Sequence, residues 1–187
     1  MSTNASEWRL HSAARVIRTG GVIAYPTEAV FGLGCDPANG RAVARLLELK
    51  HRPPDKGLIL IASEWSQLSN WLQEISLVWQ GRLDASWPGP VTWLIPAADH
   101  CPYWLTGDHE TLAVRITDHP VVRALCNRLG SAIVSTSANR SGKKPARSLL
   151  EIRLQFGQQL DYVLAGALGG LSRPTEIRDL ASGRIVR

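Results

Sequence analysis

The chain has 187 residues, 44% of them hydrophobic and 20% charged, the size and composition of one globular domain. Its longest apolar runs, such as residues 57–62, are far too short to cross a bilayer, and the N-terminus lacks the pattern of a secretory leader. Three scattered cysteines argue against a disulfide framework. We therefore expect a cytoplasmic protein without a membrane segment, organised as one domain over residues 1–187 with a core from about residue 7.

The formal net charge is +5, and the cations gather in two segments. Residues 41–56 carry five Lys or Arg against two acidic residues, and residues 140–153 carry five against one. Clustered cations favour a polyanionic partner, either a nucleotide or a nucleic acid. The alternative interpretation is that they are two solvated helix faces.

Helices and strands alternate along the first half of the chain. Apolar spacing, glycines and prolines predict a helix over residues 6–18, a strand over 22–25, a glycine-containing loop over 26–34, a helix from 39 or 40 to about 50, a buried strand at 58–62 and a two-piece helix from 63 to about 82.

The second half continues the alternation. The expected elements are strands at 91–95 and 111–116, a helix from Pro120 to 129 with Gly130 just after it, an apolar strand from residue 131, a helix opened by the capping box at 148–151, and short strands at 162–164, 177–180 and 184–186. The predicted fold is α/β (or α+β), with a twisted mixed sheet flanked by helices.

A dense polar patch follows the apolar run that starts at residue 131. It reads Ser135-Thr-Ser137-Ala-Asn139-Arg-Ser141-Gly, with Lys143, Lys144 and Arg147 just beyond. Open α/β sheets bind ligands at the carboxyl ends of their strands. Short hydroxyl and amide groups beside cations therefore predict a cradle for an anion or a nucleotide.

The common phosphate-binding and metal-binding motifs are missing from the sequence. There is no Walker-type loop, and Pro37 stands where a dinucleotide-binding glycine motif needs its third glycine. The five histidines lack metal-ligand spacing, so we interpret them as ordinary surface or core residues and expect no metal site made of protein side chains. A nucleotide would have to be bound by another design.

Three further segments carry polar groups next to predicted strands. Thr27 follows the strand at 22–25 in a Pro-Thr-Glu turn, three cations surround the proline pair at 53–54, and a Trp-Pro-Gly-Pro turn precedes Thr92. Arg115 lies in an otherwise apolar strand, where it needs a partner, a cleft or an anion. Each segment alone also fits an ordinary turn or helix end.

Taken together, these segments resemble the YrdC-like threonylcarbamoyl-AMP synthases of the short, single-domain bacterial type. Six motifs occur in the family's order and span almost the whole chain: Pro26-Thr-Glu-Ala-Val-Phe-Gly-Leu-Gly34, Lys50-x-Arg52-Pro, Trp87-Pro-Gly-Pro-Val-Thr92, Leu112-Ala-Val-Arg115, Ser135-Thr-Ser-Ala-Asn139-x-Ser-Gly142 and Pro174-Thr-Glu-Ile-Arg178. The ordered set is far more specific than any one motif.

The resemblance implies a nucleotidyltransferase with a positive, concave cleft. The family condenses L-threonine, bicarbonate (or CO2) and ATP to L-threonylcarbamoyl-adenylate and pyrophosphate. Other proteins then transfer the threonylcarbamoyl group to N6 of adenosine 37 in tRNAs that read codons beginning with A. The implied partners are therefore these substrates, Mg²⁺ carried by the ATP phosphates, tRNA or double-stranded RNA on the basic face, and the downstream transfer proteins. We expect a monomer.

The resemblance also implies roles for individual residues. Its catalytic tetrad corresponds to Lys50, Arg52, Ser137 and Asn139. The ATP-binding residues are expected to be Arg52, Lys56, Thr92, Ser137, Asn139 and Arg173, and the residues that hold L-threonine are expected to be Thr27, Arg115, Ser135 and Ser141.

Two other classes of function compete with the enzyme. The basic segments equally suit a non-catalytic module that binds double-stranded RNA or tRNA, such as a ribosome-maturation factor. A structural subunit with a vestigial pocket is the third possibility. Threonine-dependent release of pyrophosphate separates the enzyme from both alternatives.

Overall fold

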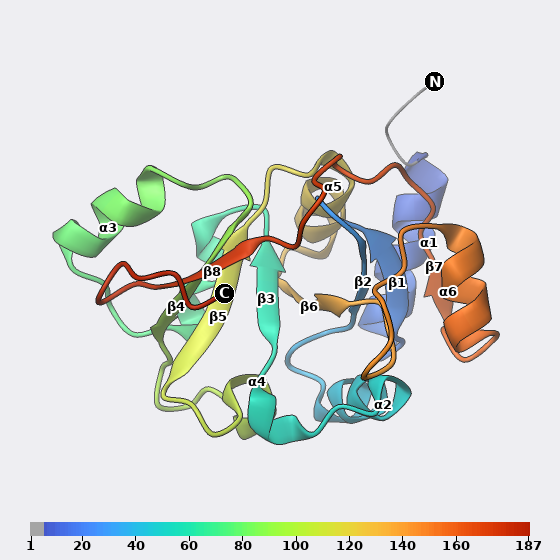
Figure 1. Cartoon of the computed structure of the whole chain (residues 1–187), viewed down its shortest axis with the longest axis horizontal. Coiled ribbons are helices and arrows are strands. Elements are labelled where there is room, and N and C mark those ends of the chain that lie inside the picture. The colour runs from blue at the N-terminus through green and yellow to red at the C-terminus, as the bar shows by residue number, and fades with distance from the viewer. Residues whose placement is uncertain (1–5) are drawn as a thin grey trace.

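The computed structural model describes residues 6–187, so residues 1–5, which the expectation about a secretory leader concerns, lie outside the described residues. Eight strands form one mixed sheet in the order β7-β1-β2-β6-β3-β5-β4-β8. Their bounds are β1 (Ile23–Pro26), β2 (Phe31–Gly34), β3 (Ile59–Ala62), β4 (Val91–Pro96), β5 (Thr111–Ile116), β6 (Ile133–Ser137), β7 (Tyr162–Val163) and β8 (Glu176–Asp179). Figure 1 shows the central strands side by side, and the predicted twisted mixed α/β sheet is confirmed.

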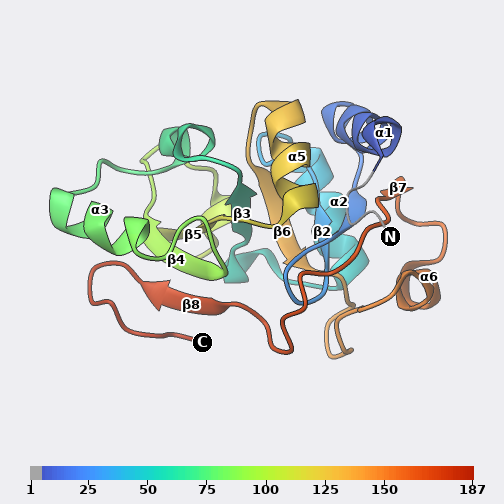
Figure 2. The same ribbon diagram turned by 90° about the horizontal axis from the view of Figure 1, so that it is seen from above.

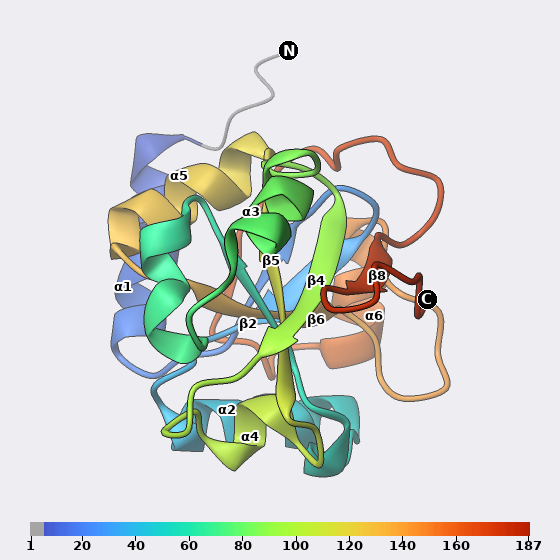
Figure 3. The same ribbon diagram turned by 90° about the vertical axis from the view of Figure 1, so that its left-hand side faces the viewer.

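Six α-helices flank the sheet within the described residues: α1 (Glu7–Arg18), α2 (Gly40–Lys50), α3 (Leu77–Asp84), α4 (Tyr103–Thr106), α5 (Pro120–Leu129) and α6 (Leu149–Phe156). Figure 2 shows α1 and α5 next to each other, and Figure 3 shows α2 and α4 together at one end of the molecule. None of these helices is long and apolar enough to cross a membrane.

Local signals set the helix ends as the sequence predicts. Asn39 Oδ1 accepts a bond of 3.1 Å from the amide of Ala42 at the start of α2, and Ser148 Oγ accepts one of 3.2 Å from Glu151 at the start of α6. Gly130 ends α5 with φ of 74°, a conformation that glycine adopts without strain.

Four expectations about local structure are wrong. Half of the predicted loop at 26–34 is strand β2, which pairs antiparallel with β1, because a chain reversal at Thr27–Val30 brings it back into the sheet. Residues 63–76 form two 3-10 turns, Trp65–Gln67 and Ser69–Trp71, and only α3 is α-helical. Residues 184–186 form an isolated bridge instead of a strand. Ser135 and Ser137 lie within β6 and not beyond its end.

Because side chains alternate along each strand, neighbouring residues pack into two different hydrophobic cores, one on each face of the sheet. Ala24, Leu60 and Val134 join the larger core, whereas their neighbours Ile61 and Ile133 pack with α1 and α5. Such period-two alternation is the normal consequence of the pleat. Both faces of the central strands are therefore buried over part of their length.

Helices α1 and α5 cover only part of one face of the sheet, and the uncovered part leaves room for a site. Ile61 and Ile133 are paired in register and lie in the core beneath these helices. Ile59 and Ser135, the next register pair on the same face, instead line a cavity. The sheet thus changes from core to cavity wall within two residues.

Candidate active site

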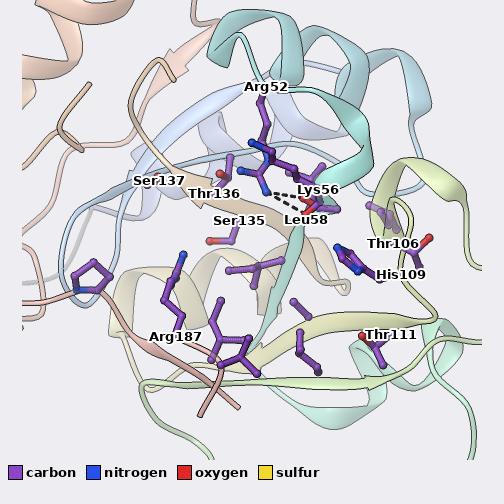
Figure 4. Close-up of a pocket in the computed structure, with 18 of the residues that line it drawn as sticks. Arg52, Lys56, Leu58, Thr106, His109, Thr111, Ser135, Thr136, Ser137 and Arg187 are labelled. Carbon is purple, nitrogen blue, oxygen red and sulfur yellow. Dashed lines mark hydrogen bonds between the residues drawn. The ribbon is translucent and has the colours of Figure 1, made fainter. Parts of the chain in front are cut away.

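Two adjoining cavities lie over the uncovered part of the sheet. The larger has a volume of about 440 Å³ and the smaller about 70 Å³. They share the β6 residues Ser135, Thr136 and Ser137 and the C-terminal Arg187. Figure 4 shows Arg52, Ser135 and Arg187 toward one side of the larger cavity and Thr106, His109 and Thr111 on the other.

Strand β6 supplies the hydroxyl wall of both cavities. Ser135 and Ser137 project to the same side because they are two residues apart. Ser135 pairs with Ile59 of β3, and Ser137 pairs with Gly32 of β2. Ser137 Oγ donates a bond of 2.6 Å to Asn139 Oδ1, which orients the hydroxyl. Asn139 itself is absent from the linings of the two cavities and holds the turn after β6 through Nδ2, which donates to Lys143 O at 2.8 Å.

Three cations line the larger cavity: Arg52, Lys56 and Arg187. Among residues 6–187 none of them forms an ion pair with an acidic side chain. Arg52 donates to the carbonyls of Lys56 at 3.1 Å and Gly57 at 3.0 Å, and its buried Nε has no hydrogen-bond partner. Burial and the neighbouring Arg187 lower the pKa of Arg52. This uncompensated charge suits a polyphosphate.

Lys50 lies behind the hydroxyl wall and not in it. Its side chain is buried at the end of α2, and its ammonium donates to the carbonyls of Ser137 and Asn139, the latter at 2.9 Å. Asn139 Oδ1 is 3.5 Å away. Burial and Arg52 lower the pKa of Lys50 to about 8. The structure therefore brings the predicted tetrad together, with Arg52 and Ser137 in the cavity wall and Lys50 and Asn139 supporting it.

Arg115 forms the floor of the smaller cavity. It is 4% exposed and pairs with Glu28, whose Oε2 lies 3.2 Å from its Nη2. Its Nη1 donates to Thr92 Oγ1 at 3.1 Å and to Thr175 Oγ1 at 2.7 Å. Arg115 Nε is buried without a partner. A guanidinium held in this way is suited to bind a carboxylate.

Of the remaining predicted site residues, two are buried at the site and two are exposed outside it. Thr27 lines the smaller cavity, where its hydroxyl donates to Val30 O at 2.7 Å. Thr92 is fully buried behind Arg115. Ser141 and Arg173 are exposed and line neither cavity. Their contacts with ATP or threonine stay predictions.

Arg187 and His109 were not identified from the sequence as residues of the cavity. Arg187 reaches the site because the C-terminal segment folds back along β8, where Val186 N donates to Ile177 O at 2.7 Å. No local pattern marks this return. His109, interpreted from sequence as an ordinary histidine, lies in the cavity wall (Figure 4).

The donor set of the cavity suits a ligand that carries phosphate groups. No group of three or more His, Cys, Asp or Glu suited to a metal ion occurs in residues 6–187. The cavity instead presents hydroxyls and cations, which bind phosphate oxygens. An anionic ligand such as a nucleotide therefore suits this site.

Sequence comparisons identify close relatives. A family model for Sua5, YciO and YrdC, described as "Telomere recombination", matches residues 15–187. A protein of Halorhodospira halophila named threonylcarbamoyl-AMP synthase is 55% identical over 180 residues, covering 96% of this chain and 94% of its own. A Pseudomonas aeruginosa protein of the same name is 52% identical over 182 residues, covering 97% and 98%.

Solved structures agree in fold. P. abyssi Sua5, crystallised with L-threonine, superposes with a TM-score of 0.89 at 31% identity, over 95% of this chain. This chain spans only about half of that longer protein, 54% of it. E. coli YciO has the same fold, with a TM-score of 0.84 at 24% identity over 98% of this chain and 92% of its own. The chain therefore belongs to the Sua5/YciO/YrdC family.

Proposed function

We propose that this protein is a threonylcarbamoyl-AMP synthase. It condenses L-threonine, bicarbonate (or CO2) and ATP to L-threonylcarbamoyl-adenylate and pyrophosphate. The observation that carries the proposal is the near full-length identity of 52–55% to proteins of that name. The paired cavities support it, since a larger cationic cavity beside a smaller one with a buried arginine accommodates two substrates.

The chemistry requires a new bond at the α-phosphorus. The threonine amine nitrogen first bonds to the carbon of carbon dioxide and loses a proton, which gives a carbamate. A carbamate oxygen then attacks the α-phosphorus, and the bond to the pyrophosphate oxygen breaks. Such a transfer depends mainly on positioning and on neutralising charge on the phosphoryl oxygens.

The residues divide between the two substrates. Arg52, Lys56 and Arg187 neutralise the phosphates of magnesium-bound ATP in the larger cavity, whose wall also holds Ser137. Ser135, which lines both cavities, is expected to hold L-threonine. Arg115 binds the threonine carboxylate from the floor of the smaller cavity, beside Thr27. Lys50 and Asn139 hold the turn that presents Ser137.

The product serves N6-threonylcarbamoylation of adenosine 37 in tRNAs that read codons beginning with A. The protein is proposed to act in the cytoplasm, as a single domain from about residue 7 and as a monomer. It passes the adenylate to the proteins that transfer the group to tRNA. The cations at 140–153 are candidates for tRNA contact.

The decisive experiment incubates purified protein with ATP, L-threonine and bicarbonate. The expected result is threonine-dependent pyrophosphate and an acid-labile adenylate. Pyrophosphate that forms equally without threonine, or none at all, would reject the proposal. In the non-catalytic alternative the protein instead binds RNA, with an affinity that falls steeply as salt rises, and releases no pyrophosphate.

A further inference from the structure

The segment of residues 164–175 is called here the strap. It joins β7 to β8, the strands at opposite edges of the sheet, and so crosses the molecule (Figure 1). Pro174 and Thr175 at its end line the smaller cavity. The strap therefore forms part of the wall around the proposed threonine site, although it has no helix or strand of its own.

Backbone bonds tie the strap to the turn that carries Glu28. Gly169 N donates to Thr27 O and Leu171 N donates to Glu28 O, each at 3.0 Å. The approach is so close that a β-carbon on Gly169 would lie 2.8 Å from the α-carbon of Glu28. Any movement of residues 27–28 is thus transmitted to the strap.

Side chains hydrogen-bond to the strap at two further points, and a series of hydrogen bonds connects each of these points to Glu28. At one end, Arg115 donates to Thr175 of the strap and pairs with Glu28 Oε2. At the other, His119 Nε2 donates to Ala167 O at 3.2 Å. The amide of His119 donates to Thr117 Oγ1 at 3.0 Å, and Thr117 Oγ1 donates to Glu28 Oε1 at 2.5 Å.

Glu28 is the only acidic group in this chain of contacts, and each of its oxygens has one fixed partner. It is 4% exposed and absent from the lining of either cavity, so it does not itself touch the space where substrates are proposed to bind. A buried guanidinium without such a carboxylate would be an unpaired charge free to choose other acceptors.

We infer that Glu28, supported by Thr117, is a positioning residue for threonine binding: it orients Arg115 and fixes the strap at the smaller cavity. The inference rests on the proposed function, because it presumes that Arg115 receives the threonine carboxylate. Its consequence is specific. Weakening the Glu28 contacts raises the KM for threonine more than the KM for ATP, because two of the proposed ATP cations, Arg52 and Lys56, line only the larger cavity.

The test measures steady-state pyrophosphate release by the full chain carrying Thr117→Val or Glu28→Gln. Thr117→Val keeps the shape of the side chain and removes the hydroxyl that donates to Glu28 and accepts from the His119 amide, so it carries the test even where Glu28→Gln fails to fold. We expect the KM for threonine to rise about threefold in Thr117→Val and about tenfold in Glu28→Gln, with kcat and the KM for ATP changed less than about twofold. Thr117→Ser keeps the hydroxyl and is therefore expected to keep the KM for threonine of the wild type. Glu74→Gln, on an exposed loop, is the matched control for a lost carboxylate.

A double-mutant cycle shows whether Glu28 acts through Arg115. Groups that work as one unit give non-additive effects. Arg115→Lys combined with Thr117→Val is therefore expected to bind threonine no worse than Arg115→Lys alone. Additive losses, or equal rises in the KM for threonine and for ATP, would overturn the inference. If the wild-type chain releases no threonine-dependent pyrophosphate, the proposed function itself fails. An active wild type with unchanged variants rejects only the role of Glu28.

Discussion

Two buried cations support the two cavities in different ways. Lys50 is 4% exposed and its ammonium is held by carbonyl and amide oxygens, without a carboxylate. Arg115 is equally buried, but it pairs with Glu28. The charge of Arg115 is thus cancelled within the protein, while that of Lys50 is not.

The difference indicates what each cation contributes. An ion pair with fixed geometry orients a fork of donors, and little net field remains beyond it. An ammonium surrounded by neutral oxygens has no opposite charge beside it, so in its protonated form it adds to the field of the neighbouring Arg52. We therefore expect the smaller cavity to bind its ligand by directed hydrogen bonds and the larger cavity to neutralise the charge of a polyanion.

The loss of stability on removing Arg115 or Lys50 is the sharpest test of the difference between these two cations. Arg115→Met leaves the buried Glu28 carboxylate unpaired and is expected to lower the free energy of unfolding by about 3–5 kcal/mol. Lys50→Met leaves only neutral carbonyls without partners, a cost of about 1–3 kcal/mol. Urea denaturation measures both. The double variant Glu28→Gln/Arg115→Met should regain much of the loss, and equal costs for the two single variants would contradict the contrast.

Activity should depend strongly on the uncompensated charge. Lys50→Met is expected to reduce kcat/KM for pyrophosphate release about 100-fold, since it removes both the charge and the support of the Ser137 turn. Lys143→Met is the matched control, because Lys143 is exposed and lines neither cavity. RNA affinity that falls together with activity in Lys50→Met would favour the RNA-binding alternative.

Arg187 should contribute less, because it is exposed at the end of the chain. Arg187→Ala is expected to lower kcat/KM for ATP about tenfold, the value of one charge-assisted hydrogen bond, with an unchanged melting temperature. Arg184→Ala removes a cation from the same segment outside the cavities and serves as the control. An effect of equal size in both variants would point to general electrostatic attraction.

The smallest effect is a pH dependence of opposite sign for activity and stability. Burial and Arg52 lower the pKa of Lys50 to about 8 from an ordinary value of 10.5. As pH rises above about 8, folded Lys50 loses its charge and kcat/KM for ATP should fall. Between about pH 8 and 10.5 the unfolded chain holds more protons, so this residue makes stability rise with pH. In Lys50→Arg the alkaline decline should disappear.

The positions of many helices and strands were predictable because they depend on residues close together in the sequence. The caps of α2 and α6 and the glycine after α5 appear where the sequence places them. Strand β2 was missed because its two glycines give a poor strand pattern. It is a strand because β1 and β6 pair with it on either side, and Gly34 allows this, since a β-carbon there would lie 2.4 Å from Val134 O.

The candidate site was predictable in composition but not in arrangement. Motif resemblance named Lys50, Arg52, Ser137 and Asn139, and the structure brings them together. Which of these side chains faces the cavity depends on the pairing of β6 with β3 and β2 and on the burial of the end of α2. These are contacts between residues far apart in the chain, which local spacing does not report.

The sequence alone determined the fold class, the helix ends and the family resemblance, because these depend on residue pattern along the chain. Only the tertiary structure decided that Lys50 lies behind the wall, that Arg187 returns to the cavity, and that Glu28 joins Arg115 to the strap. The physical reason is the same in each case. The partner of a buried charge is chosen by packing across the sheet, and no local pattern encodes that choice.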